Sequence, residues 1–359
     1  MADKNEVLLK VENLCQYFRL DATTVNKAVD NVSFDIKKGE VFGLVGESGC
    51  GKTTTGRSII KLYDITSGSV FFKGKRICAG VKSYKDAIAA AKKELRTCKD
   101  EARSAELKEI IAKNKEEMKA AQEDHKKADR KLVNEIQMIF QDPIASLDPR
   151  MTVRDIIAEG LIIRGEKDKE KIDQQVYKIL ETVGLVQEHA TRYPHEFSGG
   201  QRQRIGIARA VIMNPELIIA DEPISALDVS IQAQVINLLH ELSEKMGLTI
   251  MFIAHDLAVV KYFSDRIGVM YFGKLVELGT SDEVFAHPFH PYTRSLLSAI
   301  PLPDPITEKS RSRMTYNPMF DHDYSKEGPS MQEVYPGHFV YCNTEELEKY
   351  RKEYEEAQK

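Results

Sequence analysis

A glycine-rich segment that follows a short apolar run is the feature that most constrains the fold of this chain. Residues 46–53 read Gly-Glu-Ser-Gly-Cys-Gly-Lys-Thr, which fits the phosphate-binding pattern G-x-x-x-x-G-K-[ST]. Glu40–Val45 predicts a strand that enters this loop, and Lys52–Leu62 predicts a helix that leaves it. A strand, a loop and a helix in this order indicate an α/β fold that binds a nucleoside triphosphate.

The residue types of the loop suit contacts to phosphate groups. Glycines allow successive backbone N–H groups to point at phosphate oxygens, and the start of the helix adds the positive end of its dipole. Lys52 is expected to reach the β- and γ-phosphates, Thr53 to bind Mg²⁺ and Thr54 to contact the α-phosphate. The predicted phosphate-binding residues are Gly46, Ser48, Gly49, Cys50, Gly51, Lys52, Thr53 and Thr54.

Composition excludes several other classes of protein. The chain has 359 residues, 42% hydrophobic and 30% charged, which favours a soluble protein with one large domain plus an appendage, or two domains. A net charge of −4 disfavours a nucleic-acid partner. The polar start predicts no signal peptide, and no apolar run is long enough to cross a membrane. Five scattered cysteines favour reduced thiols in a cytoplasmic protein.

A second pair of segments narrows the class. Phe197–Gln201 reads Phe-Ser-Gly-Gly-Gln, and the apolar run that starts at Leu217 ends in Asp221-Glu222. Together with the phosphate loop, these segments resemble the ATPase subunits of ABC transporters. The resemblance implies an α/β fold: a P-loop ABC ATPase core, made of a RecA-like sheet and an antiparallel β subdomain, with an α-helical subdomain. We expect this nucleotide-binding domain over residues 1–275, its helical subdomain over 150–213, and a C-terminal extension over 276–359.

The resemblance also assigns catalytic roles. Glu222 matches the general base that polarises the attacking water, and Asp221 matches a carboxylate that holds Mg²⁺ through water. His255 follows the apolar run Leu248–Ala254 and matches a switch histidine that contacts the γ-phosphate. Gln141 follows Ile136–Phe140 and matches a glutamine that meets Mg²⁺ and the water. The implied Mg²⁺ ligands are Thr53, Gln141 and Asp221.

Other residues of the implied ATP site belong to the family's two-subunit arrangement. In this family, two ATPase subunits sandwich ATP head to tail, and the Ser-Gly-Gly-Gln tract of one faces the γ-phosphate of the other. The matching residues here are Ser198, Gly199, Gly200 and Gln201, with Asp228 in a loop that crosses to the partner subunit. Phe18, or alternatively Tyr17, aligns with the aromatic that stacks on adenine; either could instead be a core aromatic.

Three longer stretches point to one subfamily. Residues 140–150, 193–204 and 290–305 resemble the oligopeptide/dipeptide permease ATPases of bacterial importers, and the tail resembles the "F" subunit. The resemblance implies ATP hydrolysis coupled to peptide import at the cytoplasmic face of the membrane. Implied partners are a paralogous ATPase subunit or a second copy, two transmembrane permeases and an extracytoplasmic peptide-binding protein. Many relatives carry a cysteine cluster in the tail; here only Cys342 lies there, so no iron–sulfur cluster is expected.

Two other functions fit part of the pattern. The same fold could import nickel or another small solute, and a non-transport ABC ATPase could act on DNA or ribosomes. The single ATPase core and the His290–Pro305 stretch favour the importer. The sequence leaves open the identity of the peptide and of the partner ATPase; membrane permeases and a binding lipoprotein encoded next to this chain would support the importer.

Residues 81–133 interrupt the resemblance. They contain no Gly or Pro, and mostly apolar residues, with Asn114 and His125 among them, recur at alternating spacings of three and four, from Ile88 to Ala105 and from Leu107 to Leu132. The pattern predicts an antiparallel helical hairpin with its tip near Arg103–Glu106, or alternatively a single solvated helix. His125 is expected to pack rather than to bind a ligand. Because surface insertions cost little to close, replacing 82–131 by a short linker should preserve the fold and ATP binding.

Overall fold

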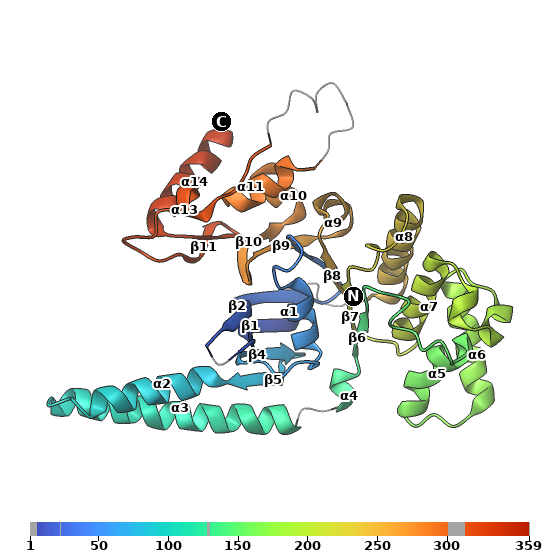
Figure 1. Ribbon diagram of the computed structural model, residues 1–359, viewed down its shortest axis with the longest axis horizontal. Helices are drawn as coiled ribbons and strands as arrows, with labels where there is room; N and C mark the ends of the chain where they lie inside the picture. The colour runs from blue at the N-terminus through green and yellow to red at the C-terminus, as the bar shows by residue number, and fades with distance from the viewer. Residues whose placement is uncertain (1–5, 22, 128–129, 301–312, 359) are drawn as a thin grey trace. The chain divides into compact units, whose positions relative to one another are not determined.

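The computed structural model describes residues 6–21, 23–127, 130–300 and 313–358 (Figure 1). The chain divides into two compact units. The first comprises residues 1–38, 53–134 and 272–274, and the second comprises residues 39–52, 135–271 and 275–359. Each unit contains its own β-sheet. Two segments of the sequence-based predictions, Ala128 in the hairpin and residues 301–305 after the core, lie outside the described residues.

The second unit is built on an eight-stranded sheet with the order β11-β12-β10-β9-β3-β8-β7-β6. Strands β9, β3, β8, β7 and β6 run parallel to one another. Every residue of β3, β7 and β8 is buried, which is typical of a parallel sheet covered on both faces. The parallel strands span Val41–Val45 (β3), Ile136–Ile139 (β6), Leu217–Asp221 (β7), Thr249–Ala254 (β8) and Arg266–Tyr271 (β9).

Most helices of the second unit bury an apolar face. They are α5 (Val153–Ile163), α6 (Lys169–Thr182), α7 (Gly199–Val211), α8 (Val229–Met246), α9 (Leu257–Phe263) and α10 (Ser281–Ala286). In α5, Val153, Ile156, Ile157 and Leu161 are buried at helical spacing, and they join a core that extends to the parallel sheet. Figure 1 shows α5, α6 and α7 gathered together in green. These three helices lie within the range 150–213 that was predicted to be helical.

The C-terminal part of the second unit adds to the same sheet. Strand β10 (Lys274–Thr280) pairs antiparallel with β12 (His338–Cys342), and β12 pairs antiparallel with β11 (Ser330–Tyr335). The helices of this part are α11 (Pro291–Ser298), α13 (Pro318–Asp321) and α14 (Thr344–Ala357). A small core forms here around Phe289, Val340 and Tyr350. The tail is thus folded onto the edge of the main sheet.

The first unit carries an antiparallel sheet with the order β2-β1-β4-β5. Its strands are β1 (Val7–Arg19), β2 (Val25–Lys37), β4 (Ser67–Phe72) and β5 (Lys75–Val81), and its first helix is α1 (Lys52–Ile59). Buried and exposed residues alternate through part of β2, where Val32, Phe34 and Ile36 face the core. Helix α1 ends three residues before Leu62, the predicted end.

The inserted segment folds as a helical pair, α2 (Lys82–Leu95) and α3 (Glu101–Lys127), followed by the short α4 (Arg130–Val133). Figure 1 shows α2 and α3 side by side, which confirms the predicted hairpin and excludes the single solvated helix. The predicted tip near Arg103–Glu106 is wrong, because the chain reverses at residues 96–100. The Asp100 carboxylate accepts a hydrogen bond from Ala102 N (3.0 Å) and so caps α3 at its start.

The C-terminal turns of α3 pack against β5. His125 is central to this contact: its carbonyl oxygen accepts a hydrogen bond from Lys61 Nζ (3.1 Å), and its Nδ1 accepts one from Ala79 N (3.4 Å). Arg76 pairs with Asp124 at 3.3 Å. His125 therefore has a structural role, as predicted, and the hairpin base belongs to the packing of the first unit. Among all described residues, no helix has the length and apolar character needed to span a bilayer.

Candidate functional site

Four predicted site segments lie at one edge of the parallel sheet. The phosphate loop follows β3, Gln141 lies just after β6, Glu222 directly follows β7 and His255 directly follows β8. These strands are consecutive in the sheet, in the order β3-β8-β7-β6. Because they are parallel, their carboxyl ends meet at the same edge, which is where ligands bind in open α/β sheets.

The phosphate loop is shaped by glycine and closed by its lysine. Gly46 has φ of +154°, and a Cβ atom there would lie 2.2 Å from the Met270 carbonyl oxygen, so only glycine fits. The Lys52 ammonium donates hydrogen bonds to the carbonyl oxygens of Gly46 (2.7 Å) and Glu47 (2.9 Å). Burial raises the pKa of the Cys50 thiol, so this side chain is neutral beside the Lys52 ammonium.

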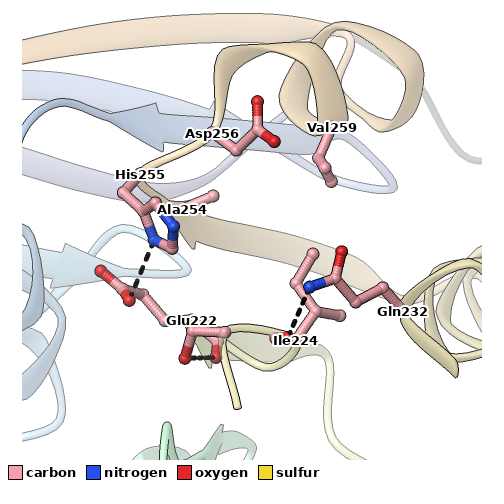
Figure 2. Close-up of a pocket in the computed structure, with 8 residues that line it drawn as sticks. Glu222, Ile224, Gln232, Ala254, His255, Asp256 and Val259 are labelled. Carbon is pink, nitrogen blue, oxygen red and sulfur yellow. Dashed lines mark hydrogen bonds and ion pairs between the residues drawn. The ribbon is translucent and has the colours of Figure 1, made fainter. Parts of the chain in front are cut away.

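The predicted catalytic residues converge on the carboxylate of Glu222. Gln141 Nε2 donates a hydrogen bond to Glu222 Oε2 (3.1 Å). His255 Nδ1 lies 3.2 Å from the same oxygen, and Figure 2 shows the His255 ring turned towards the Glu222 carboxylate. The other oxygen, Oε1, lies 3.9 Å from Lys52 Nζ. A carboxylate, an imidazole, an amide and an ammonium group are thus assembled from four separate segments of the chain.

The backbone of Glu222 is held in an uncommon conformation. Its φ is +43°, in the left-handed region that residues other than glycine rarely adopt. Its N–H donates a hydrogen bond to the Ile253 carbonyl oxygen (2.9 Å) in the neighbouring strand. Such backbone strain persists where the surrounding structure fixes it, and it is concentrated at functional sites. Asp221, the preceding residue, is fully buried at the end of β7.

A cavity of about 60 Å³ lies beside this carboxylate. It is lined by Glu222, Ile224, Ser225, Gln232, Ala254, His255, Asp256 and Val259 (Figure 2). No motif in the sequence predicts a role for Gln232, whose side-chain amide donates to the carbonyl oxygens of Ile224 (3.2 Å) and Leu227 (3.0 Å). It thereby fixes the loop that carries Asp228. The only signal in the sequence is its spacing, one helical turn after Asp228 at the start of α8.

The Ser-Gly-Gly-Gln tract forms the start of α7. Ser198 is the N-cap, and its hydroxyl accepts a hydrogen bond from Gln201 N (3.4 Å) while Gln201 Oε1 accepts one from Ser198 N (3.1 Å). The helix begins at Gly199. A Cβ atom at Gly200 would lie 2.5 Å from Ile231 Cγ2, so the glycine permits close approach to α8. The backbone N–H groups at a helix start are a favourable place for an anion.

The remaining site residues lie in the first unit. Thr53 and Thr54 are in the first turn of α1. Phe18, near the end of β1, is half-buried and makes an edge contact with Tyr63, with ring centroids 5.3 Å apart. The alternative aromatic, Tyr17, donates its hydroxyl hydrogen to Asp30 Oδ1 (2.5 Å). Phe18 and Tyr17 both stay candidates for adenine stacking.

Comparison with known proteins gives consistent matches. The chain matches the family model described as ABC transporter over residues 29–225 and the model described as oligopeptide/dipeptide transporter, C-terminal region, over residues 276–323. It is 54% identical to the oligopeptide transport ATP-binding protein OppF of Bacillus subtilis (strain 168), with 95% of this chain and 98% of that protein covered. It is 49% identical to the dipeptide transport ATP-binding protein DppF of Lactococcus lactis subsp. cremoris (strain MG1363), with 96% and 97% covered.

Solved structures confirm the fold class. One similar structure is the dimeric post-hydrolysis state of the ATP-binding cassette MJ0796 bound to ADP and Pi. Its sequence is 26% identical to this chain, the TM-score is 0.56, and the match covers 76% of this chain and 99% of that chain. The structure of cbiO1 from Clostridium perfringens also has a TM-score of 0.56, at 24% identity, and covers 79% and 92%. The chain belongs to the ABC transporter family and, within it, to the oligopeptide transport ATP-binding proteins.

Proposed function

We propose that this chain hydrolyses ATP and that the hydrolysis powers an ABC importer of oligopeptides or dipeptides. The observation that carries the ATPase assignment is the convergence on Glu222, which has Lys52, Gln141 and His255 within 3.9 Å. These side chains have the chemistry that phosphoryl transfer to water requires, namely positioning and charge stabilisation. The assignment to peptides is supported by the relatives, which are named for oligopeptide or dipeptide transport.

The residues have complementary roles in this reaction. The loop N–H groups and Lys52 bind the phosphates, and the lysine offsets their negative charge. Glu222 accepts a hydrogen bond from the attacking water and takes its proton. The water oxygen then bonds to the γ-phosphorus as the bond from that phosphorus to the β–γ bridging oxygen breaks. Gln141 and His255, which both contact Glu222 Oε2, hold the carboxylate in place and meet the water and the γ-phosphate respectively.

Two of the proposed Mg²⁺ ligands, Gln141 and Asp221, belong to this edge of the sheet. The candidate ligands, the Thr53 hydroxyl, the Gln141 amide and the Asp221 carboxylate, offer the oxygen atoms that Mg²⁺ prefers. Asp221 is fully buried directly before Glu222, which places its carboxylate at the same strand end. When bound with ATP, the ion would neutralise charge on the phosphate oxygens.

A second ATPase subunit would complete the site. The start of α7 is an anion-binding helix terminus, and Ser198, Gly199, Gly200 and Gln201 are proposed to face the γ-phosphate held by the partner subunit, with Asp228 at the same interface. The related cassette MJ0796 is a dimer. The partner here is proposed to be a paralogous ATPase or a second copy. Two permeases and a peptide-binding protein complete the importer, which places this chain at the cytoplasmic face of the membrane.

The domain limits and the tail complete the proposal. We place the nucleotide-binding domain at residues 1–275, with the helical subdomain at 150–213 and the hairpin at 81–133, and the extension at 276–359. We propose that the extension holds no iron–sulfur cluster. Its one cysteine, Cys342, is fully buried, whereas an iron–sulfur cluster is held by several cysteine thiolates.

The experiment that tests this proposal is reconstitution of the transporter. The chain is co-expressed with its permeases, the second ATPase and the binding protein, and the complex is placed in lipid vesicles. We expect peptide-loaded binding protein to stimulate ATP hydrolysis and to drive peptide uptake, whereas nickel ions do neither. Stimulation by nickel alone, or hydrolysis that is indifferent to peptide, would contradict the peptide assignment while leaving the ATPase assignment standing.

A further inference from the structure

One hydrogen bond connects the C-terminal extension, residues 276–359, to the phosphate loop. The hydroxyl oxygen of Tyr292, in α11, accepts a hydrogen bond from the backbone N–H of Glu47 (3.0 Å). Tyr292 is 2% exposed and is one of the largest fully buried side chains of the described chain. Glu47 opens the turn of the loop, since its carbonyl oxygen accepts hydrogen bonds from Cys50 N (3.3 Å) and Lys52 Nζ (2.9 Å).

Hydrogen bonds to His290 and Glu277 hold the start of α11 in place, and they restrict the position of Tyr292. His290 is the N-cap of the helix, and its Nδ1 accepts a hydrogen bond from Tyr292 N (3.1 Å). The buried carboxylate of Glu277 accepts hydrogen bonds from Phe289 N (2.9 Å) and His290 N (3.1 Å). His338 Nε2 lies 2.8 Å from the same carboxylate, which ties β12 to this corner.

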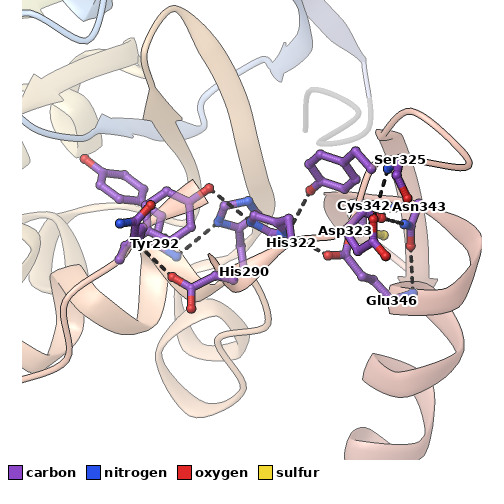
Figure 3. A network of polar contacts seen from close by, with 12 residues as sticks. His290, Tyr292, His322, Asp323, Ser325, Cys342, Asn343 and Glu346 are labelled. Carbon is purple, nitrogen blue, oxygen red and sulfur yellow. Dashed lines mark hydrogen bonds and ion pairs between the residues drawn. The ribbon is translucent and has the colours of Figure 1, made fainter. Parts of the chain in front are cut away.

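Aromatic packing fixes the Tyr292 ring from the sides. The ring centroid lies 4.4 Å from that of Tyr271 and 5.7 Å from that of Tyr316. His290 in turn lies against His322, with centroids 5.0 Å apart, and Figure 3 shows His290 between Tyr292 and His322. Burial raises the pKa of the Tyr292 hydroxyl, so it stays protonated at any physiological pH and keeps its acceptor role as a neutral group.

We propose that Tyr292 is a positioning residue of the ATP site, through which the C-terminal extension holds the entry of the phosphate loop in its phosphate-binding shape. This inference rests on the proposed function and deepens it, because it assigns a role in ATP binding to a residue outside the ATPase core. The loop N–H groups can converge on phosphates only when the turn that begins at Glu47 is in place. The Tyr292 hydroxyl supplies that constraint before ATP arrives, so ATP binding does not have to order the loop.

The variant that isolates this bond is Tyr292→Phe, which removes the hydroxyl and keeps the ring. Its matched control is Tyr316→Phe, in the same aromatic cluster, whose hydroxyl is bonded to His322 Nε2 (3.0 Å) rather than to the loop. The full-length chain and both variants are compared by ATP-binding titration and by thermal melting. Their KM for ATP and kcat are then measured in the assembled transporter.

We expect Tyr292→Phe to raise the Kd and KM for ATP by about three- to ten-fold, the range for loss of one buried neutral hydrogen bond, with kcat changed by less than about two-fold. Tyr316→Phe is expected to leave Kd and KM unchanged even where it lowers Tm. Equal Kd values in wild type and Tyr292→Phe, or equal effects of both variants on Kd, would overturn the proposal. Failure of the wild-type chain to bind ATP would instead overturn the proposed function itself.

Discussion

Glu222 Oε2 lies 3.2 Å from His255 Nδ1, although the two residues are 33 positions apart in the sequence. They directly follow β7 and β8, whose parallel register pairs Asp221 with Ile253. The distance is therefore set by the hydrogen-bond ladder of the sheet rather than by a loop. The sheet therefore holds the His255 imidazole beside the Glu222 carboxylate.

Replacing His255 by alanine should impair hydrolysis more than binding. The imidazole holds the Glu222 carboxylate and is proposed to meet the γ-phosphate, so its loss removes stabilisation that matters in the transition state. We expect turnover in the assembled transporter to fall at least about ten-fold, with the Kd for ATP changed by less than about three-fold. The control is His240→Ala, an exposed histidine on α8 that lies near Glu244. An equal loss of binding and turnover would argue against a role confined to the chemical step.

Replacing Lys52 by alanine should weaken ATP binding itself. The ammonium is almost fully buried at the mouth of the loop, where its charge attracts phosphate more strongly than it would in water. We expect the Kd for ATP to rise by more than about ten-fold, measured by titration with a fluorescent ATP analogue. Lys245→Ala, which removes an exposed partner of Glu241, should bind ATP like the wild type. Normal nucleotide affinity in the Lys52 variant would remove this lysine from the site.

The hairpin can be divided by its contacts. In the outer half, Arg103 pairs with Glu94 and Glu106 of the hairpin itself, whereas at the base Asp124 and His125 contact β5 and Lys61. Replacing residues 90–112 by a short Gly/Ser linker should therefore leave Tm within about 2 °C of wild type, because closing a surface loop costs little. Replacing 82–131 should lower Tm by several degrees more, because it also removes the contacts of Asp124 and His125. The sequence alone predicted only that the fold and ATP binding would survive this larger replacement.

Both hairpin deletions should keep ATP affinity unchanged, and co-purification with the permeases tests whether the hairpin contacts another subunit. A large drop in Tm for the 90–112 replacement would show that the outer half is also part of the fold of the first unit. Normal co-purification and normal transport for that variant would remove partner contact as its role.

Stability should fall with acid in a way that depends on His290. Burial, with smaller contributions from His322 and Arg294, lowers the pKa of His290 to about 3 in the folded chain, against 6.5 for an ordinary histidine. Between pH 6.5 and pH 3, His290 is protonated in the unfolded chain but neutral in the folded chain. The contribution of neutral His290 to the free energy of unfolding is therefore complete above pH 6.5. It is lost as the pH falls towards 3, by about 2 kcal/mol at pH 5.

The measurement is Tm between pH 7.5 and pH 5 for wild type and His290→Asn, since asparagine can cap α11 without titrating. Between pH 7.5 and pH 5, the Tm of His290→Asn should fall less than the Tm of the wild type. The exposed-site control, His240→Asn, should follow the wild-type curve. Parallel curves for wild type and His290→Asn would show that His290 takes up its proton without unfolding the chain.

Local sequence patterns predicted the strands that carry the site residues, but not the order of those strands in the sheet. Gln141, Glu222 and His255 each follow a short apolar run, and such runs predict strands locally. Their meeting at one carboxylate depends on strand order, which local patterns do not encode and which the family resemblance supplied. The sequence predicts the hairpin tip near Arg103–Glu106 because the three–four spacing is interrupted between Ala105 and Leu107. That interruption lies inside α3, and the Asp100 cap instead sets where α3 starts.

Tyr292 shows the limit of sequence reasoning most clearly. It lies in a stretch that identified the subfamily, yet its bond to Glu47 spans 245 positions, and no periodicity or motif predicts such a contact. The same applies to the Glu277–His338 pair, which depends on how β12 docks on β10.

The most direct test of the account is ATP turnover by Glu222→Gln in the assembled transporter. The substitution keeps the shape of the side chain but removes the carboxylate that takes the proton of the attacking water. We predict that ATP binds with near-normal affinity, that an ATP-bound dimer accumulates, and that turnover falls well below a tenth of wild type. The control Glu241→Gln, at an exposed site on α8 paired with Lys245, should hydrolyse ATP normally. Turnover above about a tenth of wild type, a loss of only ~1.4 kcal/mol in transition-state stabilisation, would contradict the assignment of Glu222 as the general base.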